Sequence, residues 1–241
     1  MPTAKVNEIQ IYYEIHGEGE PLVFIGGLAT DITEFEGIIR ELSQNYRVIA
    51  FDNRGAGRTD KPDIPYSIEM MADDTAGLLN ALGIERANML GISMGGRIAL
   101  ALAIQHPKLV TRLVLVSTSA KSSKRKWRLR LLSILTNVPI FRSKYPQPHY
   151  AFLRQRNASR SYDATDWLHE IRMPTLILHG KKDKTTPYKL AEEMHAGIAG
   201  SKMIAFNGGH LFFFIRQKQF LDAVSDFLGS AADSNLLPGQ R

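Results

Sequence analysis

The sequence predicts an α/β fold in which helices cover both faces of a mostly parallel sheet. Three observations support this prediction. Short runs rich in Val, Ile and Leu recur along the chain, each run is apolar at consecutive positions, and segments of helical pattern separate the runs. Strands that are apolar on both faces are typical of a parallel sheet. The alternation of strand and helix predicts right-handed crossover connections between parallel neighbours.

The expected strands follow in order along the chain. Residues 6–15 alternate weakly between apolar and polar side chains, which favours an antiparallel hairpin at the edge of the sheet. The apolar runs predict further strands at residues 22–25, 48–51, 89–92, 113–116, 176–178 and 203–206.

Helices are expected at residues 67–82, 94–104, 187–195 and 211–228. Ser67 is a suitable N-cap for the first of these helices, and Gly83 is a suitable residue to end it. Pro187 fits the first turn of the third helix because its missing N–H has no partner there in any helix.

One stretch, residues 120–166, interrupts the alternation and contains three prolines and many basic residues. An insertion between two strands is a natural place for a lid over an active site. We therefore expect a core formed by residues 1–119 and 167–229, a lid at 120–166, and a flexible tail at 230–241.

The composition excludes several classes of site. The 241 residues include no cysteine, which excludes disulfides, thiolate metal sites and a cysteine nucleophile. His, Asp and Glu do not cluster at ligand spacings, so we expect no metal and no cofactor. The N-terminus shows no apolar signal-peptide core, and no apolar run reaches the length of a membrane span. A cytoplasmic protein is therefore expected.

The basic charge is concentrated in one stretch. The net charge is +6, yet residues 121–160 contain 11 Lys and Arg and no Asp or Glu, so the rest of the chain is mildly acidic. Five apolar residues in this stretch follow helical spacing, which predicts an apolar stripe beside a basic face. They are Trp127, Leu131, Ile134, Leu135 and Val138. Three interpretations remain open: a lid with solvated bases, capture of an anionic substrate, and contact with an anionic membrane surface. No nucleic-acid partner is expected because the stretch lacks a recognised binding module.

The motif Gly91-Ile92-Ser93-Met94-Gly95 follows an apolar strand and opens a helix. A G-x-S-x-G motif in this position forms a sharp strand-to-helix turn that exposes the serine hydroxyl above the sheet. Ser93 is therefore a candidate nucleophile.

A serine nucleophile needs a base, and the base needs an orienting carboxylate. His210 follows the last expected strand in a glycine-rich loop, at the edge where catalytic groups of open α/β sheets gather. Asp183 is the only carboxylate in the loop after the 176–178 strand. The rival acid position after Val116 holds Ser117, Thr118 and Ser119, which favours Asp183.

Together these residues resemble the α/β-hydrolase superfamily over residues 6–228. The resemblance rests also on Phe24-Ile25-Gly26-Gly27-Leu28, on residues 52–60, and on the strand before Asp183. It implies an eight-stranded sheet with a helical lid after the sixth strand. It also implies Ser93 as nucleophile, His210 as base and Asp183 as acid.

The resemblance further implies an oxyanion hole formed by the backbone N–H groups of Leu28 and Met94. Many family members carry His-Gly before the first of these residues, whereas this chain carries Gly26-Gly27. The imidazole that normally holds the loop is therefore missing. The segment from Asp52 to Arg54 is expected to be scaffold.

Residues 28–31 and 65–68 resemble the branch of small carboxylesterases and 3-oxoadipate enol-lactonases. We therefore expect a carboxylic ester hydrolase that acts on a small ester or lactone, with Trp127 and Leu211 in the substrate pocket. Two alternatives stay open. One is an enol-lactonase or C–C bond hydrolase for an acidic substrate, and the other is a ligand sensor that retains the triad. The oligomeric state cannot be predicted from the sequence.

Overall fold

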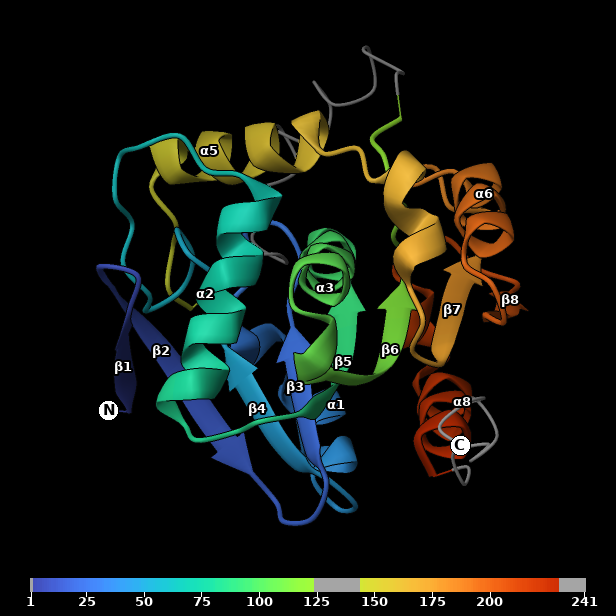
Figure 1. Ribbon diagram of the computed structural model, residues 1–241, viewed down its shortest axis with the longest axis horizontal. Coiled ribbons are helices and arrows are strands. Elements are labelled where there is room, and N and C mark those ends of the chain that lie inside the picture. The colour runs from blue at the N-terminus through green and yellow to red at the C-terminus, as the bar shows by residue number, and fades with distance from the viewer. Residues whose placement is uncertain (1, 124–143, 230–241) are drawn as a thin grey trace, which may run out of the picture.

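The computed structural model describes residues 2–123 and 144–229 (Figure 1). It contains an eight-stranded sheet with the strand order β1-β2-β4-β3-β5-β6-β7-β8. The β1–β2 and β2–β4 pairs are antiparallel and the other pairs are parallel, which confirms the predicted mostly parallel sheet. The strands are β1 Thr3–Val6, β2 Ile9–His16, β3 Pro21–Ile25, β4 Arg47–Phe51, β5 Ala87–Ile92, β6 Val110–Val116, β7 Thr175–Gly180 and β8 Lys202–Phe206.

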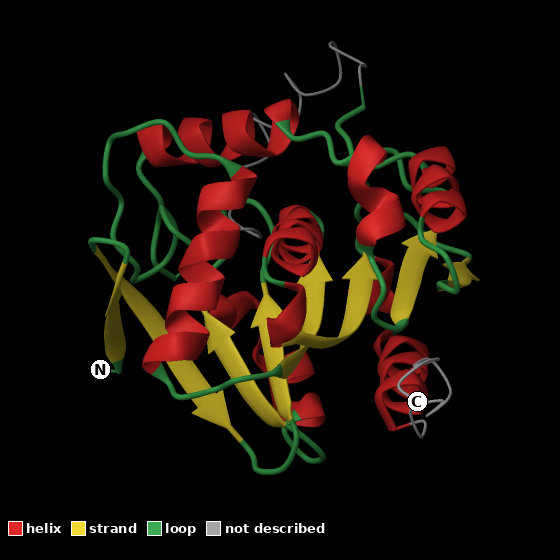
Figure 2. Ribbon diagram, in the orientation of Figure 1, coloured by secondary structure: helices red, strands yellow, loops and turns green. Residues whose placement is uncertain are grey.

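Helices cover the sheet on both faces (Figure 2). The described helices are α1 Glu36–Leu42, α2 Ile68–Ala81, α3 Met94–Gln105, α5 His149–Ser161, α6 Tyr188–Gly197, α7 Phe212–Ile215 and α8 Gln217–Gly229. Alternate residues of a strand enter opposite cores: Val23 packs in the cluster with α2 and α3, whereas Leu22 packs in the cluster with α1 and α8.

The ends of α2 agree with the sequence prediction. The Ser67 hydroxyl accepts the Met70 N–H at 3.0 Å, which satisfies one of the free donors of the first turn. After α2, Gly83 adopts a φ of +66°, a conformation that glycine reaches without steric conflict. The helix therefore ends where local chemistry predicts.

The prediction of one helix over residues 211–228 is wrong. The chain breaks at Arg216, between α7 and α8, with φ −117° and ψ 41°. Every residue from Leu211 to Ile215 is apolar, so periodicity gives no boundary in this run. Ring contacts fix α7 instead: Phe212 stacks on Phe206 with ring centroids 4.4 Å apart, and Phe214 stacks on Phe35 at 5.7 Å.

A short 3₁₀ turn at Ile32–Phe35 leads into α1, and the sequence analysis predicts neither element. The turn begins with a capping box, in which the Asp31 side chain accepts the Thr33 N–H and Glu34 accepts the Asp31 N–H at 3.2 Å. The Asp-x-x-Glu spacing is the sequence signal that identifies such a start.

The segment from Asp52 to Arg54 makes structural contacts. Arg54 forms a buried two-bond ion pair with Asp74 of α2, with both distances 2.7 Å. Asp52 accepts the backbone N–H groups of Ile32 and Arg58 at 2.9 and 2.8 Å. These contacts join the turn after β4 to α2 and to the 3₁₀ turn.

We use the name β6–β7 connection for residues 117–174. Its helix α5 lies on the side of the sheet toward which the parallel strands point (Figure 1). The predicted apolar stripe at Leu131, Ile134, Leu135 and Val138 lies outside the described residues, as do Trp127 and the tail at 230–241.

Candidate active site

Ser93 lies in the sharp turn between β5 and α3. Its backbone has φ +56° and ψ −113°, a strained conformation for a residue with a side chain. The Ser93 N–H donates to the Val116 carbonyl at 2.8 Å, and the Ser93 carbonyl accepts the Thr118 hydroxyl at 2.7 Å. These bonds to the end of β6 and the residues after it hold the turn in place.

The glycines of the motif permit close approach of the backbone. A Cβ atom at Gly95 would overlap the Ile25 carbonyl oxygen, and one at Gly91 would overlap the Gly95 carbonyl oxygen. A larger residue at either position would push α3 away from the strands. The turn therefore needs small residues at the positions where the motif has them.

The structure brings Ser93, His210 and Asp183 together. His210 Nε2 lies 3.0 Å from Ser93 Oγ, and His210 Nδ1 lies 2.7 Å from Asp183 Oδ2. A carboxylate accepts hydrogen bonds, so Nδ1 carries the proton and Nε2 is free to accept the serine hydroxyl. This is the geometry in which a histidine can remove a proton from a serine.

Loops at the carboxyl ends of β7 and β8 hold the two partners of Ser93. The buried Asp183 carboxylate accepts the N–H groups of Thr185 and Thr186 through Oδ1, at 2.8 and 2.9 Å. The Ser117 hydroxyl donates to the His210 carbonyl at 2.8 Å. Ser117, at the rival acid position, thus helps to hold the histidine loop.

His179 contacts the same carboxylate, a contact that the sequence analysis misses. Its Nε2 donates to the Thr186 carbonyl at 2.9 Å and lies 3.4 Å from Asp183 Oδ2. Both side chains are fully buried, and burial lowers the pKa of His179, which favours the neutral ring. The two residues are four positions apart across the end of β7, a spacing that outside a helix does not by itself indicate contact.

The loop after β3 lies beside Ser93. A Cβ atom at Gly27 would lie 3.6 Å from the Ser93 Cβ. Within residues 2–123 and 144–229, no hydrogen bond uses the backbone N–H of Leu28 or of Met94. Both donors are therefore available to a ligand, and their role in an oxyanion hole remains a prediction.

The predicted pocket residues fall on different parts of the chain. Leu211, next to His210, is 39% exposed, and nearby Phe214 and Ile215 are exposed as well. Trp127 lies outside the described residues. A pocket role for Leu211 remains a prediction.

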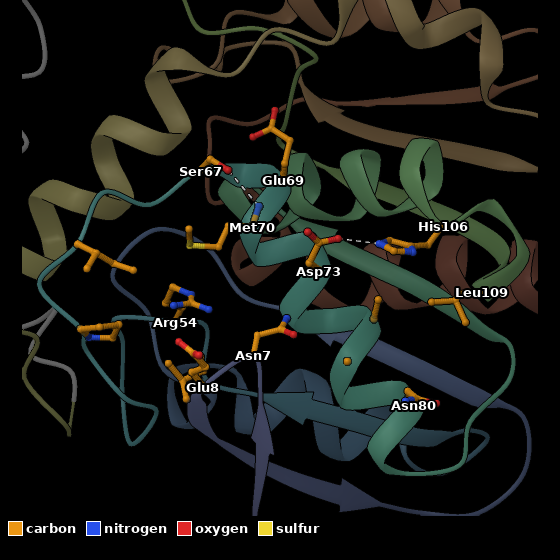
Figure 3. A pocket seen from close by; sticks show the side chains of 15 residues that line it. Asn7, Glu8, Arg54, Ser67, Glu69, Met70, Asp73, Asn80, His106 and Leu109 are labelled. Carbon is orange, nitrogen blue, oxygen red and sulfur yellow. Dashed lines mark hydrogen bonds and ion pairs between the residues drawn. The ribbon is translucent and has the colours of Figure 1, made fainter.

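A separate groove runs along α2 (Figure 3). Arg54, Ser67 and Asp73 line it, and His106 Nε2 lies 2.8 Å from Asp73 Oδ1 across it. Ser93, Asp183 and His210 do not line this groove, so it is distinct from the serine site.

Two features are absent from the described ranges. Residues 2–123 and 144–229 contain no group of three or more His, Asp or Glu that could hold a metal ion. Among the helices described, none is long and apolar enough to cross a membrane.

Comparisons with known proteins identify the family. A family model described as alpha/beta hydrolase fold matches residues 20–166, and a model described as TAP-like protein matches residues 153–233. The chain is 31% identical to 2-hydroxymuconate semialdehyde hydrolase from Pseudomonas sp. (strain CF600), over 89% of each chain.

Solved structures show the same similarity. The enol-lactonase from Burkholderia xenovorans LB400 superimposes with a TM-score of 0.84 at 26% identity, covering 95% of this chain and 100% of that chain. The esterase from Exiguobacterium antarcticum superimposes with a TM-score of 0.82 at 26% identity, covering 95% and 99%. Because the first family model alone covers more than half of the sequence, the chain belongs to the α/β-hydrolase family.

Proposed function

We propose that the protein is a serine hydrolase that cleaves a carboxylic ester bond of a small substrate through an acyl-enzyme. One observation carries the proposal: an unbroken hydrogen-bonded chain from Asp183 through His210 to Ser93, with distances of 2.7 and 3.0 Å. A buried carboxylate, an imidazole held in one tautomer and a half-buried serine in a strained turn are the parts that acyl transfer needs.

The reaction begins with attack on the ester carbonyl. Ser93 Oγ forms a bond to the carbonyl carbon while His210 Nε2 takes the hydroxyl proton. Asp183 stabilises the positive imidazolium through Nδ1. The tetrahedral intermediate then collapses, the alkoxide leaves with the proton from His210, and an acyl-enzyme remains on Ser93. His210 next removes a proton from water as the water oxygen bonds to the acyl carbon. The second tetrahedral intermediate then collapses, Ser93 Oγ leaves with the proton from His210, and the acid is released.

Two backbone donors support the charge that develops on the carbonyl oxygen. We assign this role to the N–H groups of Leu28 and Met94, which have no partner among the described residues. Each such donor contributes about 3 kcal/mol to transition-state stabilisation in serine hydrolases of known mechanism. Neither residue needs a particular side chain for this role.

A second candidate function is lactone or C–C bond hydrolysis of a substrate that bears a carboxylate. Two observations favour it: the 31% identity to a protein named 2-hydroxymuconate semialdehyde hydrolase, and the 11 basic residues of stretch 121–160. Basic side chains near a site bind carboxylates by charge-assisted hydrogen bonds. Both candidate functions would use Ser93, His210 and Asp183 at the carboxyl ends of the parallel strands.

A substrate panel tests the proposal and separates the candidates. Wild type, Ser93→Ala and a control, Ser43→Ala, are assayed on neutral esters, lactones and acid-bearing diones. Ser43 caps the end of α1 through a bond to the Arg40 carbonyl and therefore reports the effect of losing a hydroxyl elsewhere. We expect turnover of neutral esters by wild type and Ser43→Ala, and a loss of about 10⁴-fold or more in Ser93→Ala.

Preference for acid-bearing diones or lactones would replace the ester assignment with the second candidate. Wild-type turnover by Ser93→Ala would contradict both candidates. A single slow turnover that leaves a stable adduct would identify a ligand sensor rather than an enzyme.

A further inference from the structure

We propose that Gln155 of α5 is the positioning residue for the loop after β3, and that it thereby aligns the Leu28 N–H for oxyanion stabilisation. This inference rests on the proposed serine-hydrolase function. It gives α5, which belongs to the β6–β7 connection, a positioning role in the proposed reaction.

The Gln155 side chain is fully buried, and its amide accepts one hydrogen bond and donates another. Its Oε1 accepts the Ala29 N–H at 3.0 Å, and its Nε2 donates to the Arg54 carbonyl at 2.7 Å. A backbone N–H on one side and a backbone C=O on the other fix the orientation of the amide. The side chain therefore bridges the turn after β3 and the turn after β4.

Two hydrogen bonds hold the two peptide planes that flank Leu28, and one of them comes from Gln155. The plane before it is fixed because the Gly27 carbonyl accepts the Thr30 hydroxyl at 3.1 Å. In a trans peptide the Leu28 N–H points away from that carbonyl. The plane after Leu28 is fixed by the Ala29 N–H, which Gln155 binds. The direction of the Leu28 N–H thus depends on one local bond and one bond from α5.

The loop has little else to hold this conformation. Gly26 and Gly27 have no side chains, and Ala29 adopts a φ of +60°, which is unfavourable for alanine. The Gly26 carbonyl is held by Asn53 at 3.1 Å, but this bond lies ahead of the Leu28 peptide. A residue in an unfavourable conformation persists only where surrounding contacts enforce it. Gln155 supplies such a contact.

Other bonds of α5 reach a different loop and so provide matched controls. The Tyr150 hydroxyl donates to the Lys61 carbonyl at 2.7 Å, and Arg154 pairs with Asp63 at 3.0 Å. Tyr150→Phe removes one hydrogen bond between α5 and the core without touching residues 26–30. It reports what a loosened α5 does by itself.

The first test compares steady-state kinetics of wild type, Gln155→Met and Tyr150→Phe on a p-nitrophenyl ester. Methionine has a similar length but makes neither bond. Because the oxyanion forms only in the transition state, we expect kcat of Gln155→Met to fall about 10- to 100-fold while KM changes less than about 3-fold. Tyr150→Phe should keep its kcat within about 2-fold of wild type. A Gln155→Met enzyme with wild-type kcat, or an equal fall in Tyr150→Phe, would overturn the inference.

A second variant, Gln155→Glu, is tested by the pH dependence of its kcat, which loss of packing alone would not change. The protonated carboxyl of the introduced side chain has one acceptor and one donor, as the amide does, whereas the ionised form presents only acceptors to the Arg54 carbonyl. Burial raises the pKa of such a carboxyl toward neutral pH. The kcat of Gln155→Glu relative to wild type should therefore rise as the pH falls from about 8 to about 6. A ratio that stays flat with pH would contradict the inference, even if Gln155→Met does not fold.

Ser93→Ala, run in the same assay, distinguishes a failure of the serine-hydrolase proposal from a failure of the proposed role of Gln155. Activity retained by Ser93→Ala would refute the proposed function itself. An inactive Ser93→Ala together with a fully active Gln155→Met would refute only the role of Gln155.

Discussion

Asp183 Oδ2 lies within reach of two imidazole rings. His210 Nδ1 is 2.7 Å away and His179 Nε2 is 3.4 Å away, while the other carboxylate oxygen accepts two backbone N–H groups. His179 also holds the Thr186 carbonyl, so it supports the short loop that positions the carboxylate. The orientation of His210 thus depends on a second histidine that does not contact Ser93.

The buried, neutral state of His179 predicts an effect of pH on stability. Burial lowers its folded-state pKa below the unfolded value of about 6.5, so the unfolded chain binds more protons at acidic pH. Stability is fully present above about pH 6.5 and is lost as the pH falls toward the lowered pKa.

His179→Gln keeps a donor for the Thr186 carbonyl but cannot titrate. Relative to wild type, this variant should gain on the order of 1 kcal/mol of unfolding free energy between about pH 7.5 and about pH 5. Urea unfolding at both pH values measures the difference. If the difference in unfolding free energy between the two proteins is the same at both pH values, His179 does not titrate as a buried group with a lowered pKa.

The sequence predicts those site residues that lie within a short motif or directly after a predicted strand. Ser93 lies in a five-residue motif, and Asp183 and His210 each follow a predicted strand. Gln155 and His179 escape prediction for different reasons. The bond from Gln155 to Ala29 spans 126 positions, and no periodicity or motif encodes such a pair. His179 lies at the end of a buried strand, where its sequence position indicates only packing.

Among the elements, α3 connects the serine turn to both described ends of the β6–β7 connection. Its residue Arg97 is buried and donates to the carbonyls of Ser119 and Lys121, both at 3.2 Å, and to the Ser159 carbonyl. Burial lowers the pKa of Arg97 to about 10, although the nearby Tyr162 opposes this shift. The guanidinium works here as a set of donors for backbone oxygens.

Arg97→Met should destabilise the protein by about 2–4 kcal/mol, because buried carbonyl groups lose their donors and the side-chain volume is only partly replaced. Denaturant unfolding with Arg97→Lys as a control measures the loss, and lysine should recover part of it through a single donor. A change below about 0.5 kcal/mol in Arg97→Met would show that these carbonyls find other partners.

Helices and strands are predicted correctly where the sequence pattern changes at their ends. Helix α2 has a capping serine and a terminal glycine, and β3 to β7 are apolar runs bounded by polar residues. It fails in the run from Leu211 to Ile215, where aromatic contacts with Phe206 and Phe35 decide the path of the chain. Strand β8 is exposed at Lys202 and Ile204 because it forms the edge of the sheet, a position that its composition does not reveal.

For the whole molecule, the topology explains why the three site residues meet. Strands β5, β7 and β8 are parallel, so the loops that follow them emerge at one edge of the sheet. Two bases of stretch 121–160 form ion pairs: Lys121 pairs with Glu193 at 2.8 Å, and Arg154 pairs with Asp63. These two basic side chains are therefore engaged within the fold.

The central claim is that Ser93 carries the acyl group during turnover. The most direct test mixes the protein with p-nitrophenyl acetate, quenches it in acid, and locates the modification by peptide mass spectrometry. We expect one acetyl group on the peptide that contains Ser93, a burst of p-nitrophenol equimolar with protein, and neither signal in Ser93→Ala. Turnover without an adduct on that peptide, or an equal burst from Ser93→Ala, would contradict it.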